Sequence, residues 1–387
     1  MEQTKRSMRN RFAAWFGLGA MMFGTYCGGS MASGAYATGY MTTFGGGYML
    51  VFLAIFCVFM AFFCTISLNF IRTYQVGDYN EYYLELYGLN HDGAQPVLKT
   101  VVAVFFDIYT VLMGLITTAA TINLFGQLMN SILGVPVVAG SLFAVLLFAV
   151  LTIYGSGFLR KFNTVMTIGL VLCLVAVLIA VMAVRGDVFM ERIGNFQEGL
   201  DWTGGTLSAH MAMFLSYCFS TSSWGSTLCN YSEKIKDQKD AVGAGILIAI
   251  LVTALFGVTS CIVLPFLPEM FNDGPILAIC QKYLSPALVV VYWVVVIFSV
   301  VSTGPTFTYN ISRRFTKLWK TDKVNEKLKF FVLSLVFLLV CFLVSNVGLM
   351  AIVQKGFSTM GGIAGFAIGI PLLISIYRVW RKNRVAG

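Results

Sequence analysis

The stretch of chain that most restricts the fold runs from Phe12 to Phe44 and is apolar overall but rich in glycine in its middle. It is long enough to cross a bilayer, which takes about 20 apolar residues in a helix. Its centre, residues 24–34, reads GTYCGGSMASG, and glycine inside a helix costs about 1 kcal/mol relative to alanine. Backbone groups that leave a helix in lipid need partners within the protein or in a water-filled cavity. The segment therefore predicts a membrane helix that is broken halfway, with backbone exposed to a polar guest.

The composition places the whole chain in a membrane. Of its 387 residues, 58% are hydrophobic and only 11% are charged, whereas about 25% are charged in an average soluble domain. The net charge of +9 could indicate nucleic-acid binding, but basic residues that flank membrane spans usually mark the cytoplasmic side. We therefore interpret the positive charge as a mark of the cytoplasmic loops. The expected partner is the lipid bilayer, and no nucleic acid is expected.

Cutting the chain at its polar loops predicts an all-α polytopic membrane protein with ten transmembrane helices. The predicted spans are 12–36, 43–71, 98–130, 136–155, 162–184, 205–229, 241–267, 286–311, 329–346 and 357–379. Basic residues concentrate on the even-numbered connections, most densely around Arg313, Arg314 and Lys317. This asymmetry predicts that both termini are cytoplasmic. Two connecting segments also carry structure: 78–87 predicts a short amphipathic helix, and the loop around 274–286 is expected to cover the outer mouth.

The sixth predicted span is interrupted as well. Its centre, residues 220–227, reads STSSWGST and carries no charge. One interpretation is that these hydroxyls bond back to their own helix or to a neighbour. The other is that broken spans at matching places in two halves mark a transporter's substrate site. Spans one and six each open a half of five spans, an odd number, so the halves 12–184 and 205–379 would be inverted repeats within a single transmembrane domain, 1–387.

The first span resembles that of the YkvI family of bacterial membrane proteins. The family motif approximates GTVVGAGFASGQE, and residues 24–36 read GTYCGGSMASGAY in this chain. The resemblance implies the amino acid–polyamine–organocation superfamily, a LeuT-like 5+5 inverted repeat with helices 1 and 6 broken, and the bacterial inner (plasma) membrane. Ala35 and Tyr36 replace the Gln-Glu of the motif, so no role of that glutamate is carried over.

A second polar group lies in the eighth span. Ser299, Ser302 and Thr303 share one helix face, because residues three and four apart are neighbours. The resemblance implies a Na+ site there, completed by the backbone carbonyls of Gly24 and Cys27. The alternative is a Ser/Thr packing face softened by Pro305. No other cofactor is expected.

Two ionisable residues stand out in apolar surroundings. Asp107 lies in the third span, where acids are costly and are functional candidates. It could form an inner-gate ion pair, carry a proton or bind a cationic substrate, or bond to a hydroxyl. His210 opens the sixth span and could titrate near neutrality, but a lone histidine there is more often simply hydrogen-bonded.

These features predict a secondary active transporter of a small amino acid or amine, working by alternating access and coupled to Na+ between helices 1 and 8. The alternatives are a proton-coupled transporter that uses Asp107, or a non-transporting sensor or channel of the same fold. An enzyme is not expected, since two histidines and scattered acids supply no catalytic cluster. The sequence does not predict an oligomeric state. The expected substrate-binding residues come from spans one, three and six: Tyr26, Gly28, Gly29, Ser30, Met113, Thr117, Phe219, Ser220, Thr221, Ser222 and Ser223.

Overall fold

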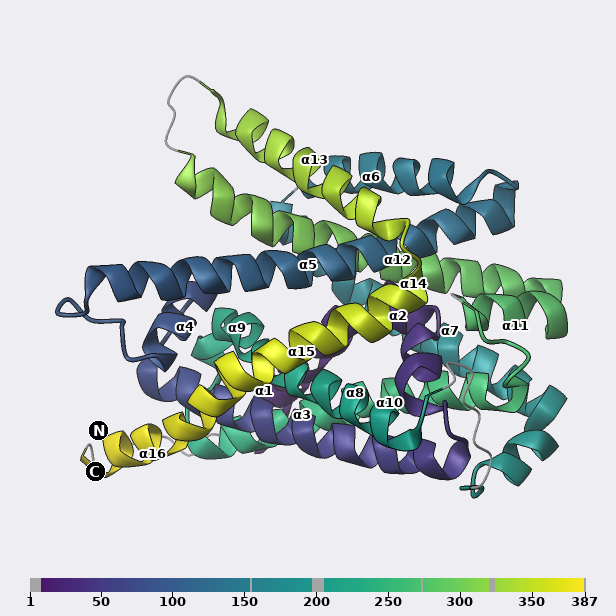
Figure 1. Ribbon diagram of the computed structural model, residues 1–387, viewed down its shortest axis with the longest axis horizontal. Coiled ribbons are helices and arrows are strands. Elements are labelled where there is room, and N and C mark those ends of the chain that lie inside the picture. The colour runs from purple at the N-terminus through teal and green to yellow at the C-terminus, as the bar shows by residue number, and fades with distance from the viewer. Residues whose placement is uncertain (1–7, 154, 197–204, 273, 320–323, 386–387) are drawn as a thin grey trace.

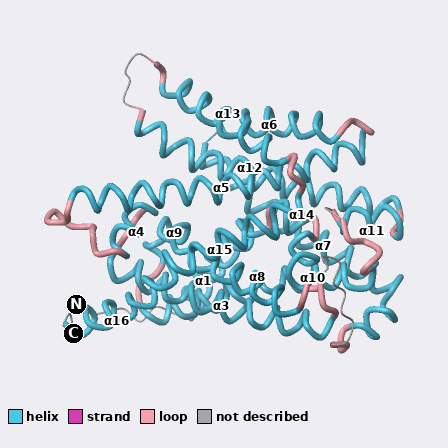
Figure 2. Tube along the Cα trace, in the orientation of Figure 1, coloured by secondary structure: helices cyan, strands magenta, loops and turns pink. Residues whose placement is uncertain are grey.

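The computed structural model describes residues 8–153, 155–196, 205–272, 274–319 and 324–385, and the regular elements in these ranges are helices (Figures 1 and 2). The prediction of an all-α membrane protein is therefore confirmed. The α-helices in chain order are α1 Met8–Tyr26, α2 Gly29–Ala32, α3 Gly46–Tyr74, α4 Tyr79–Leu86, α5 Pro96–Leu133, α6 Val137–Ile153, α7 Gly155–Arg192, α8 Leu207–Phe219, α9 Gly225–Leu228, α10 Gln238–Val263, α11 Pro275–Tyr283, α12 Pro286–Leu318, α13 Glu326–Ser345, α14 Leu349–Ala351, α15 Ser358–Ala364 and α16 Ile370–Val385.

Seven helices in the described residues are long and apolar enough to cross a membrane, and Val137–Thr152 is a shorter apolar helix. The two predicted spans that remain, 12–36 and 205–229, are divided into helical pieces. The first span consists of α1, α2 and a π-helical turn at Ala37–Met41. The sixth consists of α8, a 3-10 segment at Ser220–Trp224, and α9.

The helices pack in two groups that are joined by α7. Helix α10 packs on both α1 and α3, while α5, α6, α12 and α13 form the second group, and α7 contacts both α10 and α12. In Figure 1 the second group lies above the first, and the yellow chain of α15 and α16 runs diagonally in front toward the N-terminal end of α1. Of the interrupted segments, α2 contacts both groups, whereas α8 and α9 pack on α3 of the first group.

Both structured connections are present. The predicted helix at 78–87 is α4, which Asp78 caps by accepting a hydrogen bond from the amide of Glu81 at 2.8 Å. The loop around 274–286 contains α11, whose Ile276 amide donates to the carbonyl of Ser33 at 3.1 Å. Helix α11 is therefore fixed directly to the broken first span.

The last span is held by side chains that donate to its irregular turns. Two π-helical segments, Ile352–Phe357 and Gly365–Gly369, interrupt the α-helix. The Tyr40 hydroxyl donates to the carbonyl of Val353 at 2.6 Å, and that of Tyr87 donates to Ala367 at 2.8 Å. Such turns leave the regular hydrogen-bond ladder and are frequent at functional sites.

The contact between α15 and α8 yields a stability prediction. A Cβ on Gly361 would lie 2.0 Å from the backbone carbonyl oxygen of Ser216. Gly361→Ala should therefore destabilise the protein by about 1–3 kcal/mol, the usual cost of overpacking. Gly257→Ala in α10 is the control, because its Cβ would meet only the Leu53 side chain at 4.0 Å. Thermal unfolding in detergent would measure both, and equal melting temperatures would contradict the prediction.

Candidate functional site

The break in the first span lies at Cys27 and Gly28. The Cys27 amide closes the last turn of α1 by donating to Phe23 at 2.9 Å, and Gly28 is extended, with φ −75° and ψ −176°. A Cβ on Gly28 would lie 3.1 Å from Cγ2 of Thr303, and one on Gly29 would lie 2.9 Å from Cα of Thr121. These glycines therefore let the broken backbone approach α12 and α5 closely.

The sixth span is interrupted differently, because it tightens rather than unwinds. Ser220–Trp224 forms a 3-10 helix flanked by residues with right-handed helical angles. Its hydroxyls donate to carbonyls three residues earlier: Thr221 to Cys218 at 2.6 Å, and Ser223 to Ser220 at 2.7 Å. The first interpretation of the serine run is therefore confirmed, since its hydroxyls bond to their own backbone. Ser220 and Ser223 of the run also line a pocket, so the second interpretation stays a prediction.

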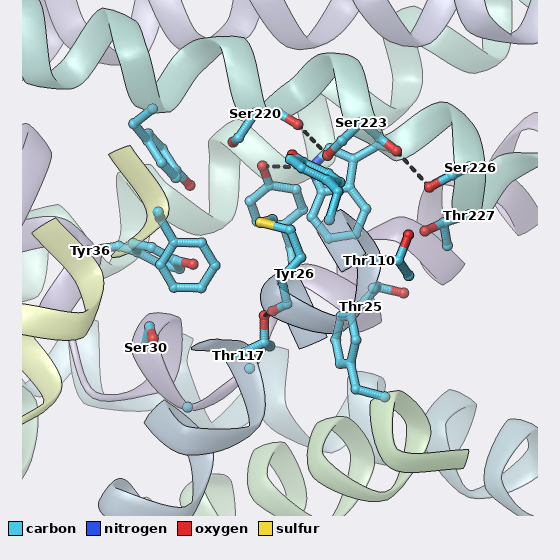
Figure 3. Close-up of a pocket in the computed structure, with 18 of the residues that line it drawn as sticks. Thr25, Tyr26, Ser30, Tyr36, Thr110, Thr117, Ser220, Ser223, Ser226 and Thr227 are labelled. Carbon is cyan, nitrogen blue, oxygen red and sulfur yellow. Dashed lines mark hydrogen bonds between the residues drawn. The ribbon is translucent and has the colours of Figure 1, made fainter. Parts of the chain in front are cut away.

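The pocket lies between the two interrupted spans and has about 750 Å³ of empty space, which includes space open to solvent (Figure 3). Its lining residues come from both interrupted spans and from α4, α5, α12 and the last span. They are Thr25, Tyr26, Gly28, Gly29, Ser30, Tyr36, Tyr83, Tyr109, Thr110, Met113, Thr117, Tyr217, Ser220, Ser223, Trp224, Ser226, Thr227, Phe307 and Phe357.

Eight of the eleven residues expected to bind substrate line this pocket. They are Tyr26, Gly28, Gly29, Ser30, Met113, Thr117, Ser220 and Ser223. The other three do not line it: Phe219 packs on Phe59, with ring centroids 5.2 Å apart, Thr221 is fully buried, and Ser222 bonds to carbonyls of Phe219 and Ala364. A helical run cannot present consecutive residues to one side, so only part of 219–223 faces the space.

Several lining residues were not predicted, and the sequence indicates some of them more clearly than others. Tyr109 and Thr110 lie one turn before Met113, and Phe307 lies one turn after Thr303, so helical periodicity could have indicated all three. Tyr83 belongs to α4, a connecting helix outside the predicted spans. No local pattern in the sequence indicates that this helix reaches the pocket.

Aromatic side chains form much of the wall. The indole N–H of Trp224 donates to the Tyr26 hydroxyl at 3.0 Å, and their ring centroids are 4.8 Å apart. Tyr217 packs beside Tyr36 at 5.5 Å and stacks on Tyr40 at 4.2 Å. The Trp224–Tyr26 contact joins the sixth span to the first across the pocket.

The two ends of the pocket differ in exposure. Tyr36, Tyr217 and Phe357 are each at most 6% exposed and close one end. Thr110 and Thr227, at the other end, are half-buried. Figure 3 shows Tyr36 at one side of the pocket and Thr110 with Thr227 at the opposite side. The pocket is therefore closed at the end that faces away from the lining helix α4.

The expected cation site lies beside the break. The Ser299 hydroxyl donates to the carbonyl of Cys27 at 2.7 Å. The Thr303 hydroxyl is buried, has no hydrogen-bond partner, and lies next to Gly28. The carbonyl of Gly24 is one of the last four of α1, and the last four carbonyls of a helix generally have no donor within that helix. The side chain of Ser302 lies outside the described part of the structure. Within the described residues, no His, Cys, Asp and Glu side chains group as a metal cluster.

Asp107 forms an ion pair rather than lining the pocket. The Arg314 guanidinium donates to its two carboxylate oxygens at 3.1 and 2.8 Å, and the Tyr79 hydroxyl donates at 2.6 Å. Burial, followed by the hydrogen bond to Asp107, raises the pKa of Tyr79, which keeps this hydroxyl a donor. Of the three interpretations of Asp107, the geometry shows two together, the ion pair and the bond to a hydroxyl. His210 is buried and hydrogen-bonded to the carbonyl of Tyr40 at 3.0 Å, as the simpler interpretation predicts.

The comparisons with known proteins give structural matches only. No protein-family model and no curated protein sequence matches the chain, so membership of the YkvI family stays a prediction. Among solved structures, inward-facing Mhp1 matches with a TM-score of 0.64 at 14% identity over 92% of this chain and 75% of Mhp1. MhsT in complex with L-phenylalanine matches with a TM-score of 0.63 at 15% identity, over 94% of this chain and 89% of MhsT. A Na+-coupled sialic acid symporter matches with a TM-score of 0.54 at 15% identity, over 94% and 86%. The chain therefore has the LeuT fold of these transporters.

The ion pair yields a prediction about stability. Asp107→Asn should cost about 1.5–3 kcal/mol, the range for hydrogen bonds to charged groups, because it leaves the Arg314 guanidinium without its carboxylate. In a double-mutant cycle with Arg314→Gln, the two losses should overlap by about 1 kcal/mol or more. Asp92→Asn, in the exposed loop before α5, is the control and should change nothing. Additive losses in thermal unfolding would show that the two side chains act independently.

Proposed function

We propose that the protein is a secondary transporter that moves a small amino acid or amine by alternating access, coupled to Na+ bound between α1 and α12. The observation that carries the proposal is the buried Thr303 hydroxyl without a hydrogen-bond partner, beside the extended Gly28. A buried hydroxyl oxygen normally has a partner, and a monovalent cation would supply one. Gly28 also lines the pocket, so cation and substrate would share one stretch of backbone.

The site offers oxygen and no carboxylate, which suits a weakly held ion. The proposed ligands are the carbonyls of Gly24 and Cys27, together with one carbonyl and two hydroxyls from Ser299, Ser302 and Thr303. Hard cations prefer such oxygen ligands, and a coupling ion must also be released. Because the ligands belong to two helices, binding would stabilise one arrangement of α1 against α12. An ion shifts a conformational equilibrium only through such differential affinity.

The structural neighbours support the same class of function. One is a Na+-coupled sialic acid symporter, and MhsT was solved with L-phenylalanine. With the termini in the cytoplasm of a bacterial inner membrane, α4 would lie on the cytoplasmic side and the half-buried Thr110 and Thr227 would face inward. The described conformation would then be inward-facing, as in the Mhp1 structure. We extend the proposal to one transport domain, 1–387, with inverted repeats 12–184 and 205–379.

The coupling mechanism can be tested in proteoliposomes. Uptake of a stabilising amino acid or amine should require an inward Na+ gradient, and a proton gradient alone should not replace it. Uptake driven by protons and indifferent to Na+ would overturn the coupling ion. Flux that persists without any gradient-dependent accumulation would overturn secondary transport itself.

Thr303→Ala should remove one proposed ligand of the cation. We expect an approximately 10-fold or larger loss of Na+ affinity, because a hydrogen-bonding group that contacts a charge contributes about 1.5–3 kcal/mol. Thr303→Ser should retain most of the affinity. The measurement is the Na+ concentration that gives half of the thermal stabilisation of purified protein.

Thr308→Ala is the matched control for this experiment. Thr308 is also buried on α12, but its hydroxyl donates to the carbonyl of Gly304 at 2.8 Å. Its loss should lower stability without changing the Na+ dependence. Equal Na+ affinities for Thr303→Ala and Thr308→Ala would contradict the proposed site.

A further inference from the structure

The chemistry of the pocket wall restricts the charge of the substrate. Among the described residues that line the pocket, eight are aromatic, eight carry a Ser or Thr hydroxyl, and none is Asp, Glu, Lys, Arg or His. The nearest carboxylate along α5, Asp107, is held by Arg314 and Tyr79. A ligand with a net charge would therefore enter a site that offers no opposite side-chain charge, and burying an unpaired charge is costly.

Four of the eight Ser and Thr hydroxyls of the wall present acceptor oxygens to the pocket. Thr117 donates to the carbonyl of Met113 at 2.8 Å, and Thr25 donates to Met21 at 2.9 Å. Ser223 and Ser226 donate in the same way to the carbonyls three residues before them, each at 2.7 Å. A hydroxyl that donates its hydrogen bond to a carbonyl of its own helix can only accept hydrogen bonds from a ligand. These four positions would favour N–H donors and disfavour a carboxylate.

The aromatic side chains act in the same direction against anions. The faces of Tyr, Trp and Phe rings carry negative partial charge, so they repel carboxylates and attract ring edges and cations. For a cation, the attraction to aromatic faces is smaller than the cost of burying an unpaired charge. The proposed Na+ beside Gly28 would repel a cationic ligand and attract an anionic one. The side chains of the wall themselves match neither a net anion nor a net cation.

We infer that the substrate is a small molecule without net charge that carries a planar ring and at least one N–H donor. The inference rests on the proposed transport function and narrows its substrate class. The ring would pack among Tyr26, Tyr217 and Trp224, and the N–H groups would bond to the acceptor hydroxyls of α5 and the sixth span. Polyamines, acidic and basic amino acids, and simple carboxylic acids are excluded as substrates.

A ring-matched ligand series tests the charge directly on the unaltered protein. Tryptophan is a zwitterion and indole-3-propionamide is uncharged, whereas tryptamine is a cation and indole-3-propionate is an anion. The measurement is the half-effective concentration of each compound in thermal shift and in inhibition of uptake, both in the presence of Na+. For one or both net-neutral compounds, this concentration should be at least tenfold lower than for the charged compounds. Leucine, which has no ring, should be at least tenfold weaker than phenylalanine.

The outcomes separate this inference from the proposed function. If tryptamine or indole-3-propionate binds as well as the neutral compounds, and its shift needs Na+, the charge rule is overturned while the transport proposal stands. If only ringless amino acids give a Na+-dependent shift, the ring requirement is overturned. If amino acids, amines and this series all fail to give a shift or Na+-driven uptake, the proposed function fails together with the inference.

A charge added to the wall gives an independent test. Ser220→Asp places a carboxylate in the pocket and should reverse the preference, so that tryptamine binds at least tenfold more tightly than indole-3-propionamide. Ser208→Asp, at an exposed position of α8 outside the pocket, is the control and should leave the preference unchanged. Thr117→Asp serves as a second variant on α5 if Ser220→Asp does not fold. An unchanged preference in a folded pocket variant would overturn the inference.

Discussion

The fold depends on how the chain satisfies backbone groups that leave a helix inside the membrane. At the break in the first span, carbonyls that have lost the helical ladder accept bonds from other elements. Ser299 donates to Cys27, Tyr292 donates to Ala32 at 2.8 Å, and the Ile276 amide donates to Ser33. All three donors lie in α11 or α12. Since unsatisfied groups in lipid cost several kcal/mol each, the break can exist only while α11 and α12 remain docked against it.

This requirement links the broken helix to its surroundings mechanically. Any movement of α1 against α12 must exchange the bond from Ser299 to Cys27 for another partner, and the proposed cation would lie at that point. The irregular backbone of the last span is also satisfied by other elements, because the hydroxyls of Tyr40 and Tyr87 donate hydrogen bonds to carbonyls of its π-helical turns. Tyr40 belongs to the continuation of the first span, and Tyr87 follows α4. Irregular backbone in one span is therefore stabilised by side chains from another.

The sequence predicted the positions of these irregular segments better than their form. The glycines at 28 and 29 predicted the break because glycine is costly inside a helix, whereas their close contacts with Thr303 and Thr121 became evident only in the structure. The 3-10 turn in the sixth span was not predicted, since serines in a helix can either release the backbone or bond to it. The partner of Asp107 was also not predictable, because Arg314 lies 207 residues away along the chain and only the packing of α5 on α12 brings them together. The same applies to Tyr83, which reaches the pocket from a connecting helix.

One face of α12 joins the parts of the proposed mechanism. Ser299, Thr303 and Phe307 follow one another at intervals of four residues, so they lie along one side of the helix. They contact, in that order, the broken backbone at Cys27, the region of Gly28, and the pocket. Two turns further, Arg314 binds Asp107, which in turn accepts from Tyr79 of α4. A displacement of α12 against α1 would therefore reach the proposed cation site, the pocket and the contact to α4 together. The proposed coupling then needs no long relay of side chains, because one helix carries all three.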